Sequence, residues 1–353
     1  AVLSRRSWKA VAPKVFKRSS LLLHGGNATL AGLMWWQLGY KEKDVFPRYT
    51  LAFAIPIAWI FFPLLDALPW FGAAQNMLRK DLACNAYRLE AWFVVDSTMN
   101  LVPMCAQSLM HLTIFYVLAG VSSNPAVWFA LYAVLVASFL TFQSIGLMFS
   151  AGVSGENVVT VAMIYVTYVF LFTGLFVPVS QTAVPWAVYA NPLIYILKLS
   201  ADAIFGIDRR KFRCGNPEKG TLFPDSCDAG EKGKISVNDI YEEYHLDRFT
   251  TYQAIVALFV MFVVARSVAY LLLRRRMKQK ERELMKYQDA APTAEEESKE
   301  DDGDESEEEE CPDEFAQEKF KTIEEQQAAI KRSAAYLCGV GTIVVLILSL
   351  IHI

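Results

Sequence analysis

The sequence predicts an all-α integral membrane protein with six transmembrane helices. Of its 353 residues, 54% are hydrophobic. Two stretches, Ser97–Gly155 and Asn157–Leu197, contain no Asp, Glu, Lys or Arg. Because about 20 apolar residues are enough for a helix to cross a bilayer, each stretch exceeds the length of one crossing. The basic residues gather in short segments between apolar ones, which is typical of loops on the inner side of a membrane.

The spans can be placed in order along the chain. The predicted crossings are Ser20–Leu38, Tyr49–Pro69, Ala91–Gly120, Ala126–Ala151, Val158–Val177 and Thr251–Leu273. Ala334–Ile353 is long enough for a seventh helix, and its alternative interpretation is a truncated or artefactual end. The chain begins at Ala1 rather than Met, so we expect it to be part of a longer polypeptide.

The chain therefore divides into parts of different composition. Residues 1–19 are an amphipathic connecting helix, 20–275 the six-helix membrane domain, 276–333 a charged cytoplasmic linker and 334–353 the apolar end. The linker contains Glu295–Glu310, which has almost no apolar residues and is predicted to be largely disordered. A solvated linker explains this acidic tract better than a metal site does.

The distribution of Lys and Arg predicts the orientation. Basic residues crowd Arg5–Arg18, the loop with Arg79, Lys80 and Arg88, and the segment Arg274–Arg282. Six crossings with a cytoplasmic N-terminus place all three groups on the inner side, as the positive-inside rule requires. The membrane is either the plasma membrane or that of an organelle.

Two segments at the inner side are predicted to be short helices. Apolar residues in the first recur with helical spacing, at Trp8, Val11, Ala12, Val15 and Phe16. This helix could be an interfacial anchor or a strut that links a cytoplasmic domain to the first span. The second segment, Ala73–Tyr87, could receive force from a partner domain or be a solvated turn.

The long segment at 178–250 is predicted to lie on the outer side. Its first part, Pro178–Gly206, is apolar but interrupted by prolines, which favours a pair of re-entrant helices. Its second part is polar and predicts a small extracellular loop domain. Cys214 and Cys227 lie in it, where an oxidising environment would let them form a disulfide, the alternative being two free thiols.

Catalytic signatures are missing from the sequence. There is no G-x-x-x-x-G-K-[ST] phosphate loop, no H-E-x-x-H and no Cys/His cluster at metal spacing. The four histidines are isolated along the sequence. We expect no catalytic residues, no metal site and no nucleic-acid partner, and a transporter rather than an enzyme. An ATP-independent secondary transporter or channel, or a membrane-embedded enzyme, are the alternatives.

Several motifs, in their order, resemble one family. They are Trp35-Trp36-Gln37-Leu38-Gly39, the run Leu78–Phe93 followed by Leu101-Val102-Pro103, the run Phe172–Pro178, the run Tyr189–Tyr195, and Arg266–Arg274. Together they cover about residues 5–280 and are similar to the membrane domain of G-type ABC transporters, a branch of the type-2 ABC exporters.

This resemblance implies that other domains work together with this membrane domain. An ATP-binding domain, upstream in the same polypeptide, would bind ATP and Mg and drive export of lipids, sterols or amphipathic small molecules. A second membrane domain would complete a homo- or heterodimer in contact with membrane lipids.

The resemblance also implies roles for particular residues. A substrate cavity would be lined by Phe61, Phe62, Thr167 and Phe170. Leu175 and Phe176 would form an apolar plug between the inner cavity and the outer exit. The coupling helix would present Arg79, Lys80, Asp81, Tyr87 and Arg88.

Overall fold

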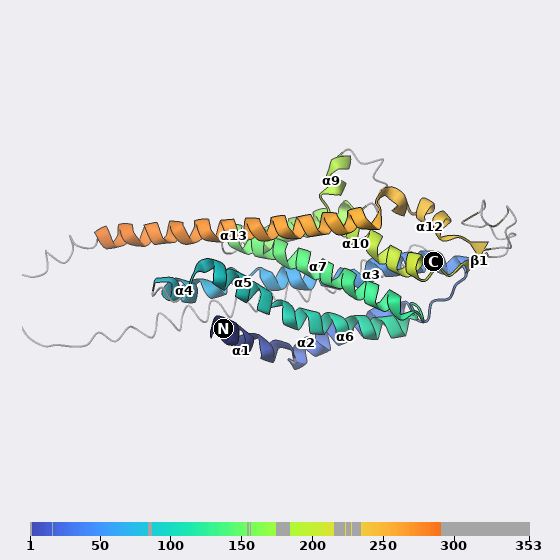
Figure 1. The fold of residues 1–353 in the computed structure, drawn as a ribbon, viewed down its shortest axis with the longest axis horizontal. Helices are drawn as coiled ribbons and strands as arrows, with labels where there is room; N and C mark the ends of the chain where they lie inside the picture. The colour runs from blue at the N-terminus through green and yellow to red at the C-terminus, as the bar shows by residue number, and fades with distance from the viewer. Residues whose placement is uncertain are drawn as a thin grey trace, which may run out of the picture.

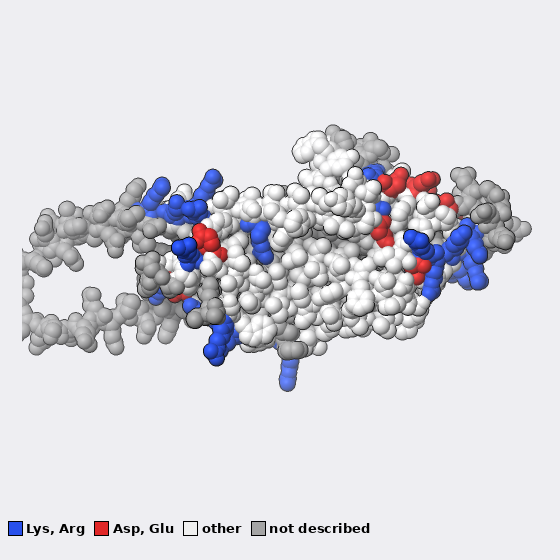
Figure 2. All heavy atoms as spheres, viewed as in Figure 1, with Lys and Arg blue, Asp and Glu red and all other residues white. Residues whose placement is uncertain are grey.

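The computed structural model of the chain describes residues 2–15, 17–83, 87–153, 155, 157–173, 184–214, 223, 227 and 234–290. These residues form an all-α membrane protein whose long helices lie along one common direction (Figure 1). Lys, Arg, Asp and Glu gather near the two ends, and few of them interrupt the surface between (Figure 2). Such a distribution keeps charges out of the hydrocarbon core.

The chain starts with two helices that meet at a sharp break. α1 (Val2–Val15) occupies the segment predicted to be an amphipathic helix, and α2 (Arg18–Met34) follows after Lys17, whose backbone is extended. α2 packs along α6 (Leu101–Ala119). A Cβ placed on Gly32 would lie 2.8 Å from the Cβ of Leu118, so the two helix backbones approach closely.

α3 (Val45–Ala67) is the central helix of the bundle and is preceded by the short 3₁₀ helix η1 (Glu42–Asp44). Nearly all of its side chains are buried, which explains why its sequence is apolar on every face. α7 (Pro125–Gly152) crosses it at Gly146, where a Cβ would lie only 2.6 Å from the carbonyl oxygen of Leu64. Glycine at this position permits the close contact of the two helices.

The predicted third span is one helical segment that is divided at Asn100 into two helices. α5 (Leu89–Met99) ends at Asn100, and α6 begins at the next residue. Pro103 lies in the first turn of α6, where its missing N–H costs no helical hydrogen bond. α6 ends before Gly120, which has a positive φ of 61° and turns the chain toward α7.

The segment between α7 and the last helix contains short elements. α8 (Asn157–Leu171) is followed by α9 (Pro185–Tyr189), α10 (Pro192–Ala201) and the π-helix η3 (Asp202–Ile207). α10 is buried along its whole length and packs against α3, α7 and α13. The strands β1 (Phe212–Arg213) and β2 (Lys234–Ile235) pair antiparallel. With α12 (Val237–Glu243) and the 3₁₀ helix η5 (Leu246–Arg248), they complete the end of the molecule that is predicted to face outward and is called the outer end below.

α13 (Thr251–Ala290) packs along α7 and continues past the other helices (Figure 1). It differs from the prediction, because the linker expected from residue 276 onward is helical up to Ala290. The segment is charged, but its Arg, Lys, Glu, Met and Leu residues are good helix formers and it contains no Gly or Pro. The remainder of the linker and the apolar end at 334–353 lie outside the described residues.

By length and composition, four helical segments of the described chain can cross a membrane, namely Glu42–Gln75, Leu89–Ala119, Pro125–Gly152 and Thr251–Gln279. They coincide with the predicted second, third, fourth and sixth spans. The predicted first span corresponds to α2, which has 17 residues. The predicted fifth corresponds to α8, which has 15 residues, and the end of this predicted span lies beyond the described part.

Candidate functional site

A polar cluster joins α1 to α4 (Trp70–Ala83) at the end of the molecule that is predicted to face the cytoplasm and is called the inner end below. Arg6 Nη1 lies 3.0 Å from Asp81 Oδ2, and the Tyr87 hydroxyl donates to the same oxygen at 2.7 Å. The Arg6 side chain is 49% exposed and that of Asp81 is 23% exposed, so water reaches the pair. Burial, reinforced by the hydrogen bond to Asp81, raises the pKa of Tyr87 and keeps its hydroxyl a donor.

This cluster contains two of the five residues predicted for the coupling helix. Asp81 lies on the last turn of α4, and Tyr87 lies between α4 and α5. Lys80 and Arg88 are exposed, and the Arg79 side chain is outside the described atoms. Arg6 was not among the predicted site residues. It lies 75 positions from Asp81, and a local sequence pattern does not reveal a contact over such a separation.

The first turn of α4 is anchored in the bundle by aromatic and polar contacts. The Trp70 ring stacks on Trp92 with centroids 4.9 Å apart, and its Nε1 donates to Asp96 Oδ2. The neighbouring Phe71 is 1% exposed, and its backbone N–H donates to Ser150 Oγ at 3.1 Å. α4 is therefore anchored in the bundle at its start and reaches α1 through Asp81 at its end.

The residues predicted to line a cavity do not form one surface within this chain. The rings of Phe61 and Phe170 stack with centroids 5.4 Å apart and join α3 to α8. Phe62 points elsewhere, because its ring meets that of His24 edge-on at 4.5 Å. Thr167 lies on the exposed side of α8. The predicted plug, Leu175 and Phe176, lies outside the described residues.

Two histidines that are distant in sequence lie together inside the bundle. His111 Nδ1 is 3.3 Å from the carbonyl oxygen of His24, and both side chains are buried. The His24 ring stacks on Trp59 at 5.2 Å, and His111 meets the same indole edge-on at 5.9 Å. These histidines are isolated along the sequence, but they meet in the structure because α2 and α6 pack side by side.

At the outer end, a buried arginine ties two loops together. Arg48 is 1% exposed, and it donates to the carbonyl oxygens of Gly39 at 3.0 Å, Val121 at 2.7 Å and Leu38 at 2.8 Å. The first loop joins α2 to α3 and the second joins α6 to α7. A guanidinium has several donors in fixed directions, so one side chain satisfies carbonyls of both loops.

Aspartates extend this outer network. Asp208 accepts from the Tyr40 hydroxyl at 2.8 Å and from the Ser122 hydroxyl at 2.7 Å. Asp202 accepts from Lys198 Nζ, the Tyr241 hydroxyl and the Thr251 hydroxyl, each at 2.7 Å. α10, α12 and α13 therefore meet at one carboxylate.

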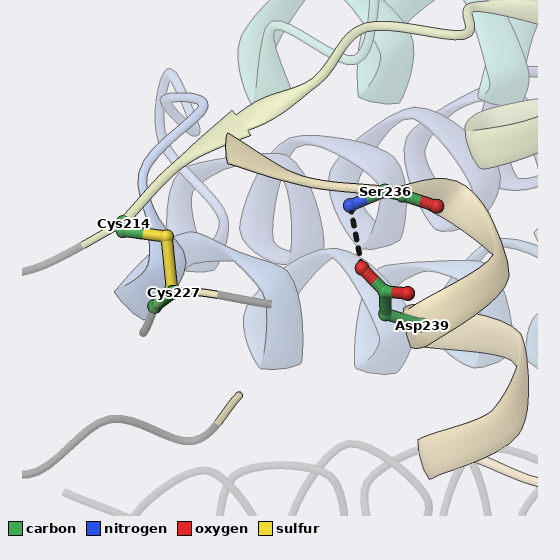
Figure 3. Close-up of a disulfide and its surroundings, with 4 residues drawn as sticks. All are labelled: Cys214, Cys227, Ser236 and Asp239. Carbon is green, nitrogen blue, oxygen red and sulfur yellow. Dashed lines mark hydrogen bonds between the residues drawn. A yellow bond between two sulfur atoms is a disulfide. The ribbon is translucent and has the colours of Figure 1, made fainter. Parts of the chain in front are cut away.

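The outer loop domain is closed covalently. Cys214 and Cys227, the disulfide candidates of the sequence, form a disulfide in the structure, with Cα atoms 5.9 Å apart (Figure 3). Nearby, the backbone N–H of Ser236 donates to the Asp239 carboxylate at 2.9 Å (Figure 3). Ser236 and Asp239 form a capping box that starts α12.

Comparison with models of protein families matches residues 1–205 to the ABC-2 type transporter, which is more than half of the chain. The chain belongs to the ABC-2 type transporter family. The match covers α1 through α10 and therefore includes the inner cluster, the stacked phenylalanines and the buried Arg48.

The curated relatives are members of the ABC transporter G family of Arabidopsis thaliana. Member 14 is 28% identical over 173 residues, which are 49% of this chain and 26% of the relative. Member 22 is 26% identical over 174 residues, 49% of this chain and 23% of the relative. Member 25 is 25% identical over 256 residues, 70% of this chain and 36% of the relative.

The chain thus spans about a quarter to a third of the length of these relatives. It is an ABC-2 type membrane domain that is similar to part of these G-family transporters. Within the ABC-2 domain as far as it is described, no three His, Cys, Asp or Glu side chains are grouped so that they could hold a metal ion.

Proposed function

We propose that this ABC-2 membrane domain is the transport pathway of an ATP-driven exporter of lipids, sterols or amphipathic small molecules. The observation that carries the proposal is the inner cluster of Arg6, Asp81 and Tyr87. It connects α1 to the last turn of α4, a second helix whose first turn is anchored in the bundle. A domain docked at the inner side could push this pair and move the bundle.

The free energy for transport would come from ATP hydrolysis in a partner domain. We infer an ATP-binding domain, with its ATP and Mg, upstream in the same polypeptide. The matched segments cover only 26% and 36% of two of these relatives, which is consistent with further domains in the whole protein.

The membrane topology would have six crossings and a cytoplasmic N-terminus. α2 and α8 would be the first and fifth crossings, and α9 with α10 would re-enter the outer leaflet. The apolar, largely buried character of α10 supports this arrangement, since backbone at membrane depth must be covered by protein. The basic residues at the inner end, which include Arg274 and Arg275, support the orientation.

Substrate would pass between two copies of the domain. α8 offers an exposed face with Ile164, Thr167 and Leu171, backed by the stacked pair Phe61 and Phe170. A surface of apolar side chains with one hydroxyl group, that of Thr167, suits a hydrophobic molecule that carries one polar group. Leu175 and Phe176 would separate the inner part of this path from the exit.

Reconstitution of the full-length protein in vesicles tests the proposal. A fluorescent sterol or phospholipid should move across the bilayer with ATP and not with a non-hydrolysable analogue. Asp81→Asn should reduce the ATP-dependent part of transport, whereas Lys43→Gln in the outer loop, the control, should not. Equal transport with and without ATP would exclude the mechanism.

A second experiment addresses the plug. Leu175→Ala and Phe176→Ala, combined, should change the rate of export or the stimulation of ATP hydrolysis by substrate. Unchanged export in the double variant would rule out the plug while leaving the ATP-driven mechanism intact.

A further inference from the structure

Arg276 binds the end of a neighbouring helix instead of facing the solvent. Its Nη1 lies 3.2 Å from the carbonyl oxygen of Ser150, 3.3 Å from that of Ala151 and 3.2 Å from that of Val153. α7 ends at Gly152, and the last carbonyls of a helix have no donor within the helix. The guanidinium supplies that donor and places a positive charge at the negative end of the helix dipole.

The same side chain also touches α4. The Arg276 guanidinium carbon lies 5.3 Å from the centre of the Phe71 ring. Phe71 is buried in the first turn of α4, and its N–H donates to Ser150 Oγ. Ser150 therefore binds α4 through its hydroxyl and α13 through its carbonyl oxygen.

These contacts bring three helices that are distant in sequence to one point. Arg276 lies on α13, Ser150 on α7 and Phe71 on α4. Close packing continues beside them, since a Cβ on Gly152 would lie 3.0 Å from Leu272 Cδ1. The adjacent Arg274 and Arg275 are exposed, so the position of Arg276 is not simply that of any basic residue at the membrane surface.

We propose that Arg276 is a positioning residue that makes α4, α7 and α13 move as one body. The inference rests on the proposed function, in which α4 receives the push of an ATP-binding domain. With the guanidinium in place, a displacement of α4 carries the inner ends of α7 and α13 with it. Without it, the last turn of α7 loses its cap, and the polar link between α4 and α7 is reduced to the hydrogen bond from the Phe71 N–H to Ser150 Oγ.

The test compares three variants of the full-length protein. Arg276→Ala removes the donor, Arg276→Lys keeps a positive charge with fewer donors, and Arg275→Ala is the control that removes one exposed charge from the same turn. The first measurement is amide hydrogen exchange in the absence of ATP. Amides at the end of α7 and the start of α4 should exchange faster in Arg276→Ala than in the natural protein. Their exchange in Arg276→Lys should be intermediate between these two, and in Arg275→Ala it should equal that of the natural protein.

The second measurement is the amount of fluorescent lipid transported per ATP hydrolysed in vesicles. Arg276→Ala should lower this ratio by about tenfold or more, the range expected when a charge-assisted hydrogen bond is lost, with basal ATP hydrolysis unchanged. Arg276→Lys should restore part of the ratio, and Arg275→Ala should leave it unchanged. A merely structural arginine would alter the exchange but leave the ratio unchanged.

The outcomes separate this inference from the proposed function. Equal exchange in Arg276→Ala and Arg275→Ala overturns the junction, whatever the transport assay shows. Faster exchange with an unchanged transport ratio overturns the positioning role alone. Transport by the natural protein that needs no ATP overturns the proposed function, and the exchange experiment still tests the junction.

Discussion

The outer and inner ends of the molecule are held together in different ways. At the outer end, Arg48 and Asp202 are buried or nearly so, each with three hydrogen-bond partners, and a disulfide closes the loop domain. At the inner end, α4 reaches α1 through Asp81 and the half-exposed Arg6. Buried polar groups are costly to leave unpaired, whereas exposed ion pairs contribute little. We therefore expect the polar contacts of the outer end to contribute more to stability than the contact of α4 with α1 does.

The largest expected effect is at Arg48. Arg48→Met removes the donors of three carbonyl groups from a buried site and should destabilise the protein by about 3–5 kcal/mol. The measurement is the thermal unfolding temperature in detergent. Arg210→Met, at a half-exposed side chain that also lies over the Tyr40 ring, is the control and should cost less than about 1 kcal/mol. Similar losses in both variants would contradict the special role of Arg48.

Removal of the disulfide should have the second-largest effect on stability. Replacing Cys214 and Cys227 together by Ser should lower the stability by about 3 kcal/mol. The two cysteines are 13 positions apart, and without the disulfide the loop between them gains conformational entropy in the unfolded state. The loss should be confined to the outer loop domain and appear as faster proteolysis there. Cys105→Ser, at a cysteine outside the disulfide, is the control. Proteolysis at the same rate in both variants would show that the bridge does not hold this domain.

The contact of α3 with α7 should show a smaller effect. The methyl group in Gly146→Ala would lie 2.6 Å from the carbonyl oxygen of Leu64, so the helices must separate, at a cost of about 1–3 kcal/mol. Gly72→Ala is the matched control, because its Cβ meets nothing within 4 Å. Alanine there favours the helix and should be neutral or stabilising in the same thermal unfolding experiment. Equal unfolding temperatures for the two variants would contradict the close contact.

The smallest effect on stability should be at the inner cluster. Arg6→Ala and Asp81→Asn should each cost less than about 1 kcal/mol, as expected for a pair that water reaches. A double-mutant cycle on the unfolding temperature should give a weak but favourable coupling between them. A coupling as large as the loss at Arg48 would mean that the inner end is as rigid as the outer one.

The sequence predicted the apolar helices well, because a helix in lipid must be apolar over a length that the bilayer sets. α7 matches its prediction within one residue at each end, since Pro125 and Gly152 flank a charge-free run. The break at Asn100 was missed, although Pro103 was a signal that a new helix could start there. The helix beyond residue 276 was missed because its charge was interpreted as disorder, whereas helix propensity depends on residue type rather than on net charge.

The candidate site was predicted only in part. Asp81 and Tyr87 were expected at the coupling helix, but their partner Arg6 lies 75 residues from Asp81. The same holds for His24 with His111, which meet across 87 residues, and for Arg276 with Ser150. A single sequence shows which residues share a helix face, but not which two helices pack together. Contacts of this kind therefore needed the three-dimensional structure.

The length of α13 has a practical consequence for imaging the protein. At 1.5 Å per residue, its 40 residues extend about 60 Å, twice the roughly 30 Å thickness of the hydrocarbon core. The part from Arg274 to Ala290 accounts for about 25 Å of this rod. Particle images of the protein in a lipid disc should show one stalk for each copy of the domain, all on the same face. Such a stalk distinguishes the two faces of the disc and provides a fixed scale from which the separation of any domain docked beside it can be measured.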